Sequence, residues 1–141
     1  MKKIICFLAV FIINNTAYSY IYYGIPKKTD ISIGSKIITN LPVNGRFEDP
    51  IQLNDLITLL NDNPNFAFHI EINSFMGTDK YCQAYSEVLC YRLEQELNER
   101  CKYQNYQLFA NGNTKPIFFS DDKAEYLGRN NRIEIIVKAK E

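Results

Sequence analysis

Near the end of the chain the stretch LGRNNRIEIIVKAKE, residues 127–141, takes a polar loop directly into an alternating strand. Ile133, Ile135 and Val137 are separated by single residues, so their side chains point to one face of that strand. A strand with one apolar face needs neighbouring strands and a second layer that covers the face. We therefore predict a strand over 132–138 that is paired within a sheet.

The partners of this strand are found by working outward along the sequence. The segment FAFHIEIN, residues 66–73, alternates as cleanly as the last strand, and apolar residues at helical spacing predict two amphipathic helices. The other strands are predicted at 35–43 and 106–110, and the helices at 48–65 and about 80–100. Residues 117–131 are interpreted as a long connection. The order β-α-β-α-β-β predicts an α/β two-layer sandwich, with two helices packed on one face of a mixed four-stranded sheet.

Acidic residues mark the start of both predicted helices. Asp49 precedes Pro50, which suits the first helical position, and the Asp49 carboxylate is predicted to cap the first-turn amides. Asp79 is predicted to be the N-cap of the second helix.

The first nineteen residues have the pattern of an export signal. Lys2 and Lys3 precede the apolar run 4–13, and Ala17 and Ser19 have the small-residue spacing that signal peptidase accepts. An uncleaved membrane anchor is the alternative, although the run has only about half the roughly 20 apolar residues of a usual span. We expect a signal peptide at 1–19, an extended N-terminal arm at 20–34 and one folded domain at 35–141.

Charge and cysteine content narrow the choice of partner. Without Lys2 and Lys3 the chain has 14 basic and 16 acidic side chains, so its net charge is about −2 and nothing favours binding of nucleic acid. Three cysteines remain, which leaves at least one unpaired or intermolecular. Cys90 is interpreted as a small core residue, while Cys82 and Cys101 lie too far apart for a disulfide unless the helix that contains them is interrupted.

Several segments resemble one known family in the family's own order. They are LNDLITLLNDNPNFAFHIEI (53–72), YSEVLCYRLEQEL (85–97), LFANGNTKP (108–116) and NNRIEIIV (130–137). These segments look like the outer-membrane-protein-A-like (OmpA-like) domains, which are peptidoglycan-associated modules of the cell envelope. The resemblance covers roughly 35–138 and retains residues at motif positions: Ser86, Cys90, Leu93, Leu97, Gly112, Pro116, Asn130, Arg132 and Glu134.

The resemblance implies a ligand, and the sequence departs from the family where that ligand is bound. The family ligand is the diaminopimelate of the peptidoglycan stem peptide, a zwitterion that needs an acid for its ammonium and an arginine or backbone amides for a carboxylate. The family's acid comes from a G-H-T-D motif, which reads SFMG here at 74–77. Its arginine position is occupied by Leu89.

Four residues are candidates for a remaining ligand site. Asp79 and Arg92 are near the lost positions in sequence, with a helix cap and a solvated helix face as their respective alternatives. Asn130 and Arg132 correspond to the family's polar cluster, which ties the loops around the ligand pocket. The alternative for Arg132 is a salt bridge or loop cap without ligand contact.

We therefore expect a non-catalytic module of the periplasm or the outer-membrane-associated envelope of a diderm bacterium, bound to peptidoglycan. The alternative is a domain of this fold that has lost peptidoglycan binding and serves as a protein–protein interaction component of an envelope assembly. No nucleophile motif, metal motif or phosphate loop is present, and His69 is the only histidine. We accordingly expect no enzymatic activity, no metal and no cofactor.

Overall fold

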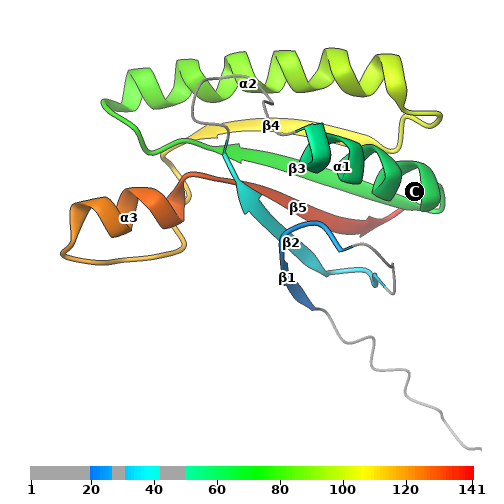
Figure 1. Cartoon of the computed structure of the whole chain (residues 1–141), viewed down its shortest axis with the longest axis horizontal. Coiled ribbons are helices and arrows are strands. Elements are labelled where there is room, and N and C mark those ends of the chain that lie inside the picture. The colour runs from blue at the N-terminus through cyan, green and yellow to red at the C-terminus, as the bar shows by residue number, and fades with distance from the viewer. Residues whose placement is uncertain (1–19, 27–30, 42–49) are drawn as a thin grey trace, which may run out of the picture.

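A computed structural model describes residues 20–26, 31–41 and 50–141, which form one mixed sheet with helices against it (Figure 1). The strands are β1 (Ile21–Tyr23), β2 (Lys36–Asn40), β3 (Phe66–Asn73), β4 (Tyr106–Gly112) and β5 (Arg132–Ala139). The helices are α1 (Pro50–Asp62), α2 (Asp79–Arg100) and α3 (Lys123–Asn130). The order of strands across the sheet is β1-β2-β5-β3-β4.

The last strand in the sequence occupies the middle of this sheet. β5 pairs antiparallel with β3 from Phe66 opposite Ala139 to Asn73 opposite Arg132, and antiparallel with β2 on its other edge. The outer pairs, β1 with β2 and β3 with β4, are parallel. The strand predicted over 132–138 is therefore enclosed on both edges.

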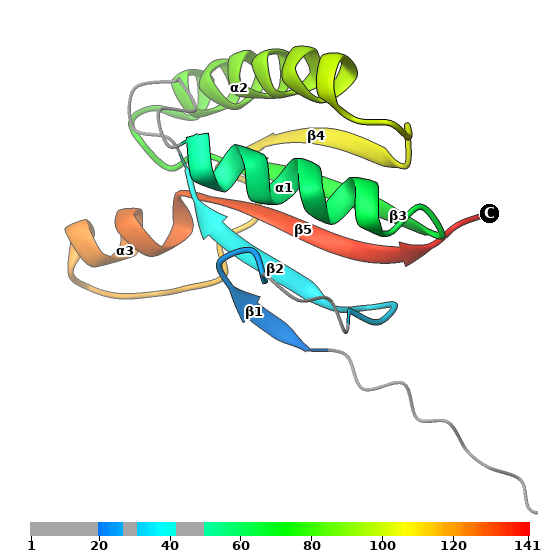
Figure 2. The ribbon, with the colours of Figure 1, turned by 45° about the vertical axis from the view of Figure 1, so that its right-hand side comes forward.

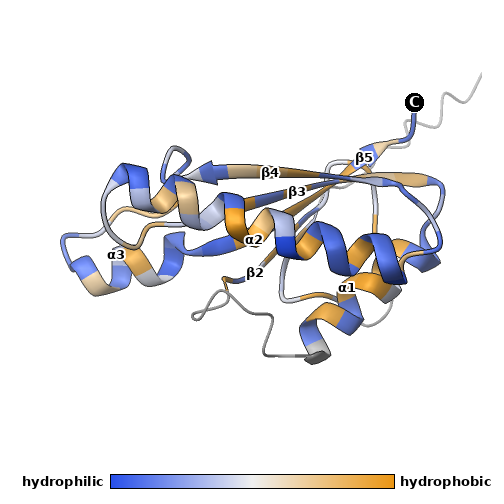
Figure 3. Cartoon of the chain, turned by 90° about the horizontal axis from the view of Figure 1, so that it is seen from above, coloured by the Kyte–Doolittle hydropathy of each residue, from blue (hydrophilic) through white to orange (hydrophobic). Residues whose placement is uncertain are grey.

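The hydrophobic core lies between the sheet and the two longer helices. α1 and α2 cover the same face of the sheet, while α3 lies beside the end of the sheet where β5 begins (Figures 1 and 2). Figure 3 shows hydrophobic residues along the strands that run beneath α1 and α2. The side chains fully buried between the two layers include Ile37, Leu60, Phe68, Ile70, Ile72, Leu89, Leu93, Leu97, Ile135 and Val137. The predicted two-layer α/β sandwich is confirmed.

The sheet has five strands, so the prediction of four was wrong. The additional strand is β1, a three-residue segment of the expected N-terminal arm. It is held at its two ends, where the Lys36 amide donates to the Tyr20 carbonyl (2.8 Å) and the Gly24 amide donates to the Ile38 carbonyl (2.7 Å). Three residues are too few to show the alternation that predicts a strand. β1 is stabilised by its pairing with β2, which the sequence of β1 alone does not reveal.

A second difference is α3, which lies within the predicted connection 117–131. Its N-cap is Asp122, whose carboxylate accepts from the Glu125 amide at 3.0 Å. An acid followed three residues later by glutamate is a helix-start pattern, so the sequence did contain a signal for α3.

The cap of α2 also differs from the prediction. The hydroxyl of Thr78 accepts from the Tyr81 amide at 3.3 Å, which makes Thr78 the N-cap. Asp79 is instead the first residue of the helix, where its negative charge interacts favourably with the helix dipole.

Several predictions concern other parts of the chain. The signal peptide at 1–19 and the capping role of Asp49 lie outside the described residues. Cys82, Cys90 and Cys101 are all free thiols, and Cys90 is half-buried against the core. Among the helices of the described segments, none combines the length and apolar character needed to cross a membrane.

Truncation of one core leucine tests the packing of α2 on the sheet. We expect Leu93→Ala, at a fully buried position, to lower the free energy of unfolding by about 2–5 kcal/mol because it removes apolar contacts and leaves a cavity. Urea unfolding followed by circular dichroism measures this change. Val88→Ala, on the exposed side of the same helix, is the control and should change it by less than about 0.5 kcal/mol. Equal effects of the two substitutions would contradict the packing described here.

Candidate functional site

Asn130 holds the loop before α3 against the end of that helix. Its side-chain oxygen accepts from the amides of Ile117 (2.8 Å) and Phe118 (3.1 Å). Its side-chain nitrogen donates to the carbonyls of Phe118 (2.7 Å) and Tyr126 (2.9 Å). The side chain is fully buried and all four of its hydrogen-bonding positions are used, so Asn130 acts as a clamp on the 117–126 segment.

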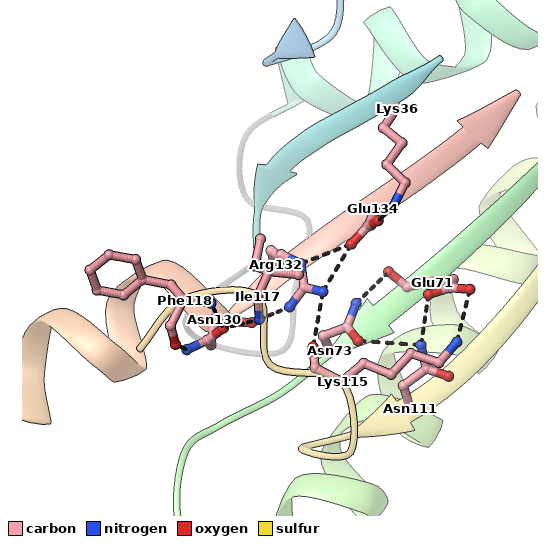
Figure 4. Close-up of polar contacts among 10 residues, drawn as sticks. All are labelled: Lys36, Glu71, Asn73, Asn111, Lys115, Ile117, Phe118, Asn130, Arg132 and Glu134. Carbon is pink, nitrogen blue, oxygen red and sulfur yellow. Dashed lines mark hydrogen bonds and ion pairs between the residues drawn. The ribbon is translucent and has the colours of Figure 1, made fainter. Parts of the chain in front are cut away.

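Arg132, the first residue of β5, is buried beside Glu134. The Arg132 Nε and one terminal nitrogen donate to a single Glu134 carboxylate oxygen at 3.0 and 2.9 Å. The other Glu134 oxygen accepts from Lys36 Nζ at 2.8 Å (Figure 4). Arg132 also donates to the carbonyls of Asn130 (3.2 Å) and Lys115 (3.0 Å). These contacts match the salt-bridge and loop-cap alternative for Arg132, because its charge is balanced within the fold.

A second cluster of polar side chains lies on β3, on β4 and in the turn after β4. Lys115 Nζ forms an ion pair with Glu71 at 3.0 Å. The side-chain nitrogen of Asn111 donates both to the Glu71 carboxylate (3.1 Å) and to the side-chain oxygen of Asn73 (3.2 Å). Lys115 connects the two groups, since its carbonyl accepts from Arg132 while its ammonium reaches Glu71 (Figure 4). The result is one network across the ends of β3 and β4 and the start of β5.

The charge of Glu134 is maintained by its two cationic neighbours. Burial acts to raise the pKa of this carboxyl group, but hydrogen bonds and positive charge from Lys36 and Arg132 outweigh burial. The pKa of Glu134 therefore lies below its ordinary value of 4.5. A buried carboxylate with this environment remains ionised at neutral pH.

In the alignment of SFMG with G-H-T-D, exposed Gly77 stands at the position of the family's acid, and Phe75 lies two residues before it. Phe75 is 4% exposed, its amide donates to the Asn131 side chain at 2.6 Å, and its ring meets the Tyr126 ring edge-on. Leu89 belongs to α2 and is fully buried in the core. Gly77 and Leu89, at the positions of the family's acid and arginine, have no charged side chain to present to a ligand.

The structure brings three of the four candidate residues to one end of the sheet. Arg132 and Asn130 are in direct contact, and Arg132 pairs with Asn73, which in turn pairs with Gly112 at the end of β4. Exposed Asp79 reaches the same end, because its carboxylate accepts from the Asn113 side chain at 2.7 Å.

Arg92 is not part of this cluster. It is exposed on α2, thirteen residues after Asp79, which places its Cα about 20 Å farther along the helix axis. One small zwitterion cannot contact both residues.

Ser86 and Gly112, two motif residues, join α2 to the end of β4. The Gly112 amide donates to the Ser86 hydroxyl at 3.0 Å, and that hydroxyl donates to the Gln83 carbonyl at 2.9 Å. Gly112 has φ of +52°, and a Cβ there would lie 3.1 Å from Gln83 backbone atoms. Only glycine permits this close approach of strand and helix.

Comparison with solved structures identifies the fold. The periplasmic domain of Helicobacter pylori MotB superimposes with a TM-score of 0.62 at 16% identity, over 85% of this chain and 86% of that chain. A putative MotB-like protein from Desulfovibrio vulgaris gives 0.57 at 16% identity over 71% and 70%. The peptidoglycan-associated lipoprotein from Burkholderia pseudomallei gives 0.53 at 18% identity over 66% and 80%. The chain has the OmpA-like fold, as the resemblance of its segments predicted.

Comparisons of sequence gave no match, either to a protein-family model or to a curated protein sequence. Within the described residues, no three histidine, cysteine, aspartate or glutamate side chains gather in a way that would hold a metal ion.

Sequence reasoning missed the contributions of Lys36, Glu71 and Asn131 to this region. Each was assigned to a strand or a loop, but their partners lie 98, 44 and 56 residues away. Alternation placed Glu71 on the polar face of its strand, but it contains no information about strand order.

Removal of Arg132 tests whether the buried ion group stabilises the fold. Arg132→Met should lower the free energy of unfolding by about 3–5 kcal/mol, because Glu134 would keep a buried charge with only Lys36 as partner. Combining it with Glu134→Gln should cost less than the sum of the two single changes, because both residues belong to one network. Chemical denaturation of the four proteins gives the coupling energy.

Lys115→Met is the control for that series. The Lys115 side chain is 52% exposed, so loss of its ion pair should change stability by about 1 kcal/mol or less. Additive effects of the Arg132 and Glu134 changes would contradict the coupled network.

The lowered pKa of Glu134 predicts how stability depends on pH. Its stabilising contribution is fully present above the unfolded-state pKa, near 4.5, and is lost as pH falls through the lower folded-state value. We expect the unfolding free energy of the native protein to drop more steeply below about pH 4.5 than that of Glu134→Gln. Denaturation midpoints of both proteins are measured across this pH range. Parallel curves of midpoint against pH for the two proteins would show that the prediction is wrong.

Proposed function

We propose that this chain is a non-catalytic module of the bacterial periplasm that associates with peptidoglycan, close to the outer membrane. The observation that carries the proposal is the OmpA-like fold with its loop-holding polar residues in place. Asn130 clamps the 117–126 segment, Arg132 joins that segment to β5, and Ser86 joins α2 to Gly112. These contacts shape the end of the sheet from which exposed Asp79 extends.

The chemistry of this end favours recognition of the stem-peptide ammonium by Asp79. The Asp79 carboxylate is exposed and is hydrogen-bonded only through one oxygen to Asn113 in the contacts described above. Arg132 contributes to the shape of the site, because its charge is balanced by Glu134. With Leu89 in place of an arginine, one charged hydrogen bond to a ligand carboxylate is lost, which weakens binding by about one to two decades.

Co-sedimentation with purified peptidoglycan sacculi tests the proposal. The native protein should be retained at low ionic strength, and Asp79→Asn should reduce the affinity about tenfold, because it removes a charge-assisted hydrogen bond. Glu99→Gln is the control: it removes one charge from the same helix, about 30 Å farther along the axis, and should leave retention unchanged. The bound fraction at increasing amounts of sacculi measures each affinity.

Two results would count against this function. If the native protein does not sediment with sacculi, association with peptidoglycan is wrong and the protein–protein interaction alternative is favoured. If Asp79→Asn and Glu99→Gln behave alike, the Asp79 end of the sheet is not the contact surface.

A further inference from the structure

β4 forms an edge of the described sheet whose protection is confined to its end, where the register shifts between Ala110 and Gly112 and the Gln83 side chain contacts the Ala110 carbonyl. It is the last strand in the sheet order, and its sequence YQLFANG contains neither a charged residue nor proline. Edge strands of soluble proteins are commonly guarded by charges, proline, bulges or a covering segment, because their free peptide groups can pair with another strand. The open part of this edge, at Tyr106 and Leu108, is thus a feature that the peptidoglycan proposal does not explain.

The peptide groups of β4 alternate in direction. The Asn105 carbonyl, just before β4, faces β3 and accepts from the Phe68 amide at 2.8 Å. The alternation of a strand then turns the peptide groups of Tyr106, Leu108 and Ala110 outward. The Ala110 carbonyl confirms this direction, since it accepts from the Gln83 side chain of α2 at 3.3 Å. The groups of Tyr106 and Leu108 face away from β3.

A groove runs along the outer side of this strand. It has a volume of about 440 Å³ and is lined by Glu94 of α2 together with Tyr106, Gln107, Leu108 and Phe109. Phe109 is 39% exposed, which is high for a phenylalanine in a strand. An edge strand with a helix beside it is the geometry in which an extended peptide can add main-chain hydrogen bonds and place alternate side chains in the groove.

The helix wall of the groove is acidic. Glu94 lines the groove, and Glu87 lies two turns before it on the same side of α2, with Cys90 between them. Burial raises the pKa of the Cys90 thiol to about 11, and the negative charges of Glu94 and Glu87 act in the same direction. A cationic segment is therefore favoured over a neutral or acidic one.

The opposite edge of the sheet shows that extended segments add to this fold. There β1, a three-residue strand, pairs in parallel with β2. The N-terminal part of the chain thus already extends the sheet by one strand.

We propose that the outer edge of β4 and the flank of α2 bind an extended segment of a partner protein that carries lysine or arginine, which adds to the sheet as a sixth strand. A second copy of this chain fits less well, because antiparallel pairing of two β4 edges would bring Glu87 and Glu94 of each copy beside those of the other. The inference goes beyond association with peptidoglycan and involves a different surface.

Fluorescence anisotropy with synthetic peptides tests this binding. The probe is a fluorescein-labelled heptapeptide of alternating lysine and valine, and the full chain is titrated against it. We expect saturable binding that weakens at least tenfold between about 0.01 M and 1 M salt, as the screening length falls from about 30 Å to 3 Å. The same peptide with alternate amides methylated, and a glutamate–valine peptide, should bind at least tenfold more weakly.

A matched pair of charge reversals identifies the groove. Glu94→Lys should weaken binding of the lysine–valine peptide about tenfold, because attraction becomes repulsion. Glu99→Lys makes the same change five residues later, about 140° around the helix axis, and should leave the affinity unchanged. Both residues are exposed, so both variants are expected to fold, and circular dichroism verifies this.

Three results would overturn the proposal: equal binding to both variants, equal binding of the methylated peptide, or no binding to the native chain. A dimer in sedimentation velocity that Phe109→Lys abolishes would also overturn it, by assigning the β4 edge to a second copy. Glu94 lies about 22 Å along the axis of α2 from Asp79, so the comparison of Glu94→Lys with Glu99→Lys tests a different surface from the sacculus experiment with Asp79→Asn.

Discussion

The C-terminal strand β5 is hydrogen-bonded on both edges, to β2 over five residue pairs and to β3 over eight, and the rest of the structure depends on that position. Because β5 lies in the middle, its first residue, Arg132, is surrounded by the ends of neighbouring strands. A buried guanidinium is costly unless it is paired. Glu134 supplies that pair from the same strand, and Lys36 of β2 completes it. Charge balance within the sheet is thus a condition for the central position of the strand.

The need of polar groups inside the fold for partners also explains why several motif residues are retained. Asn130 and Arg132 satisfy part-buried backbone carbonyls and amides of the 115–126 segment, while Ser86 accepts from the buried Gly112 amide. Removal of any of these side chains would leave a backbone group without its hydrogen-bond partner, at the greatest cost at the buried Gly112 amide. Leu89, in contrast, replaces a charge with an apolar side chain that packs in the core. The chain keeps the frame of the OmpA-like site and changes the charges within it.

Two surfaces of the domain consequently differ in character. The end of the sheet near Asp79 is built from loops that a buried polar network holds in place, and it suits recognition of a small polar group. The β4 edge is a regular strand beside the acidic flank of α2, and it suits an extended main chain. One molecule can use both surfaces at once, because the first lies beyond the strand ends and the second runs along the strand. The loss of charges at Gly77 and Leu89 therefore leaves the β4 surface unchanged.

Local pattern in the sequence was sufficient for much of the fold. The alternation of 66–73 and 132–138 and the spacing of leucines in α2 determined the long strands and the helices, because period and burial are linked within one segment. The sequence did not determine that β1 adds to β2, or that Lys36 meets Glu134 from 98 residues away. Those features depend on strand order, which is set by packing among distant segments. The edge of β4 likewise became visible only in the tertiary structure, because a strand's sequence does not say which neighbours it lacks.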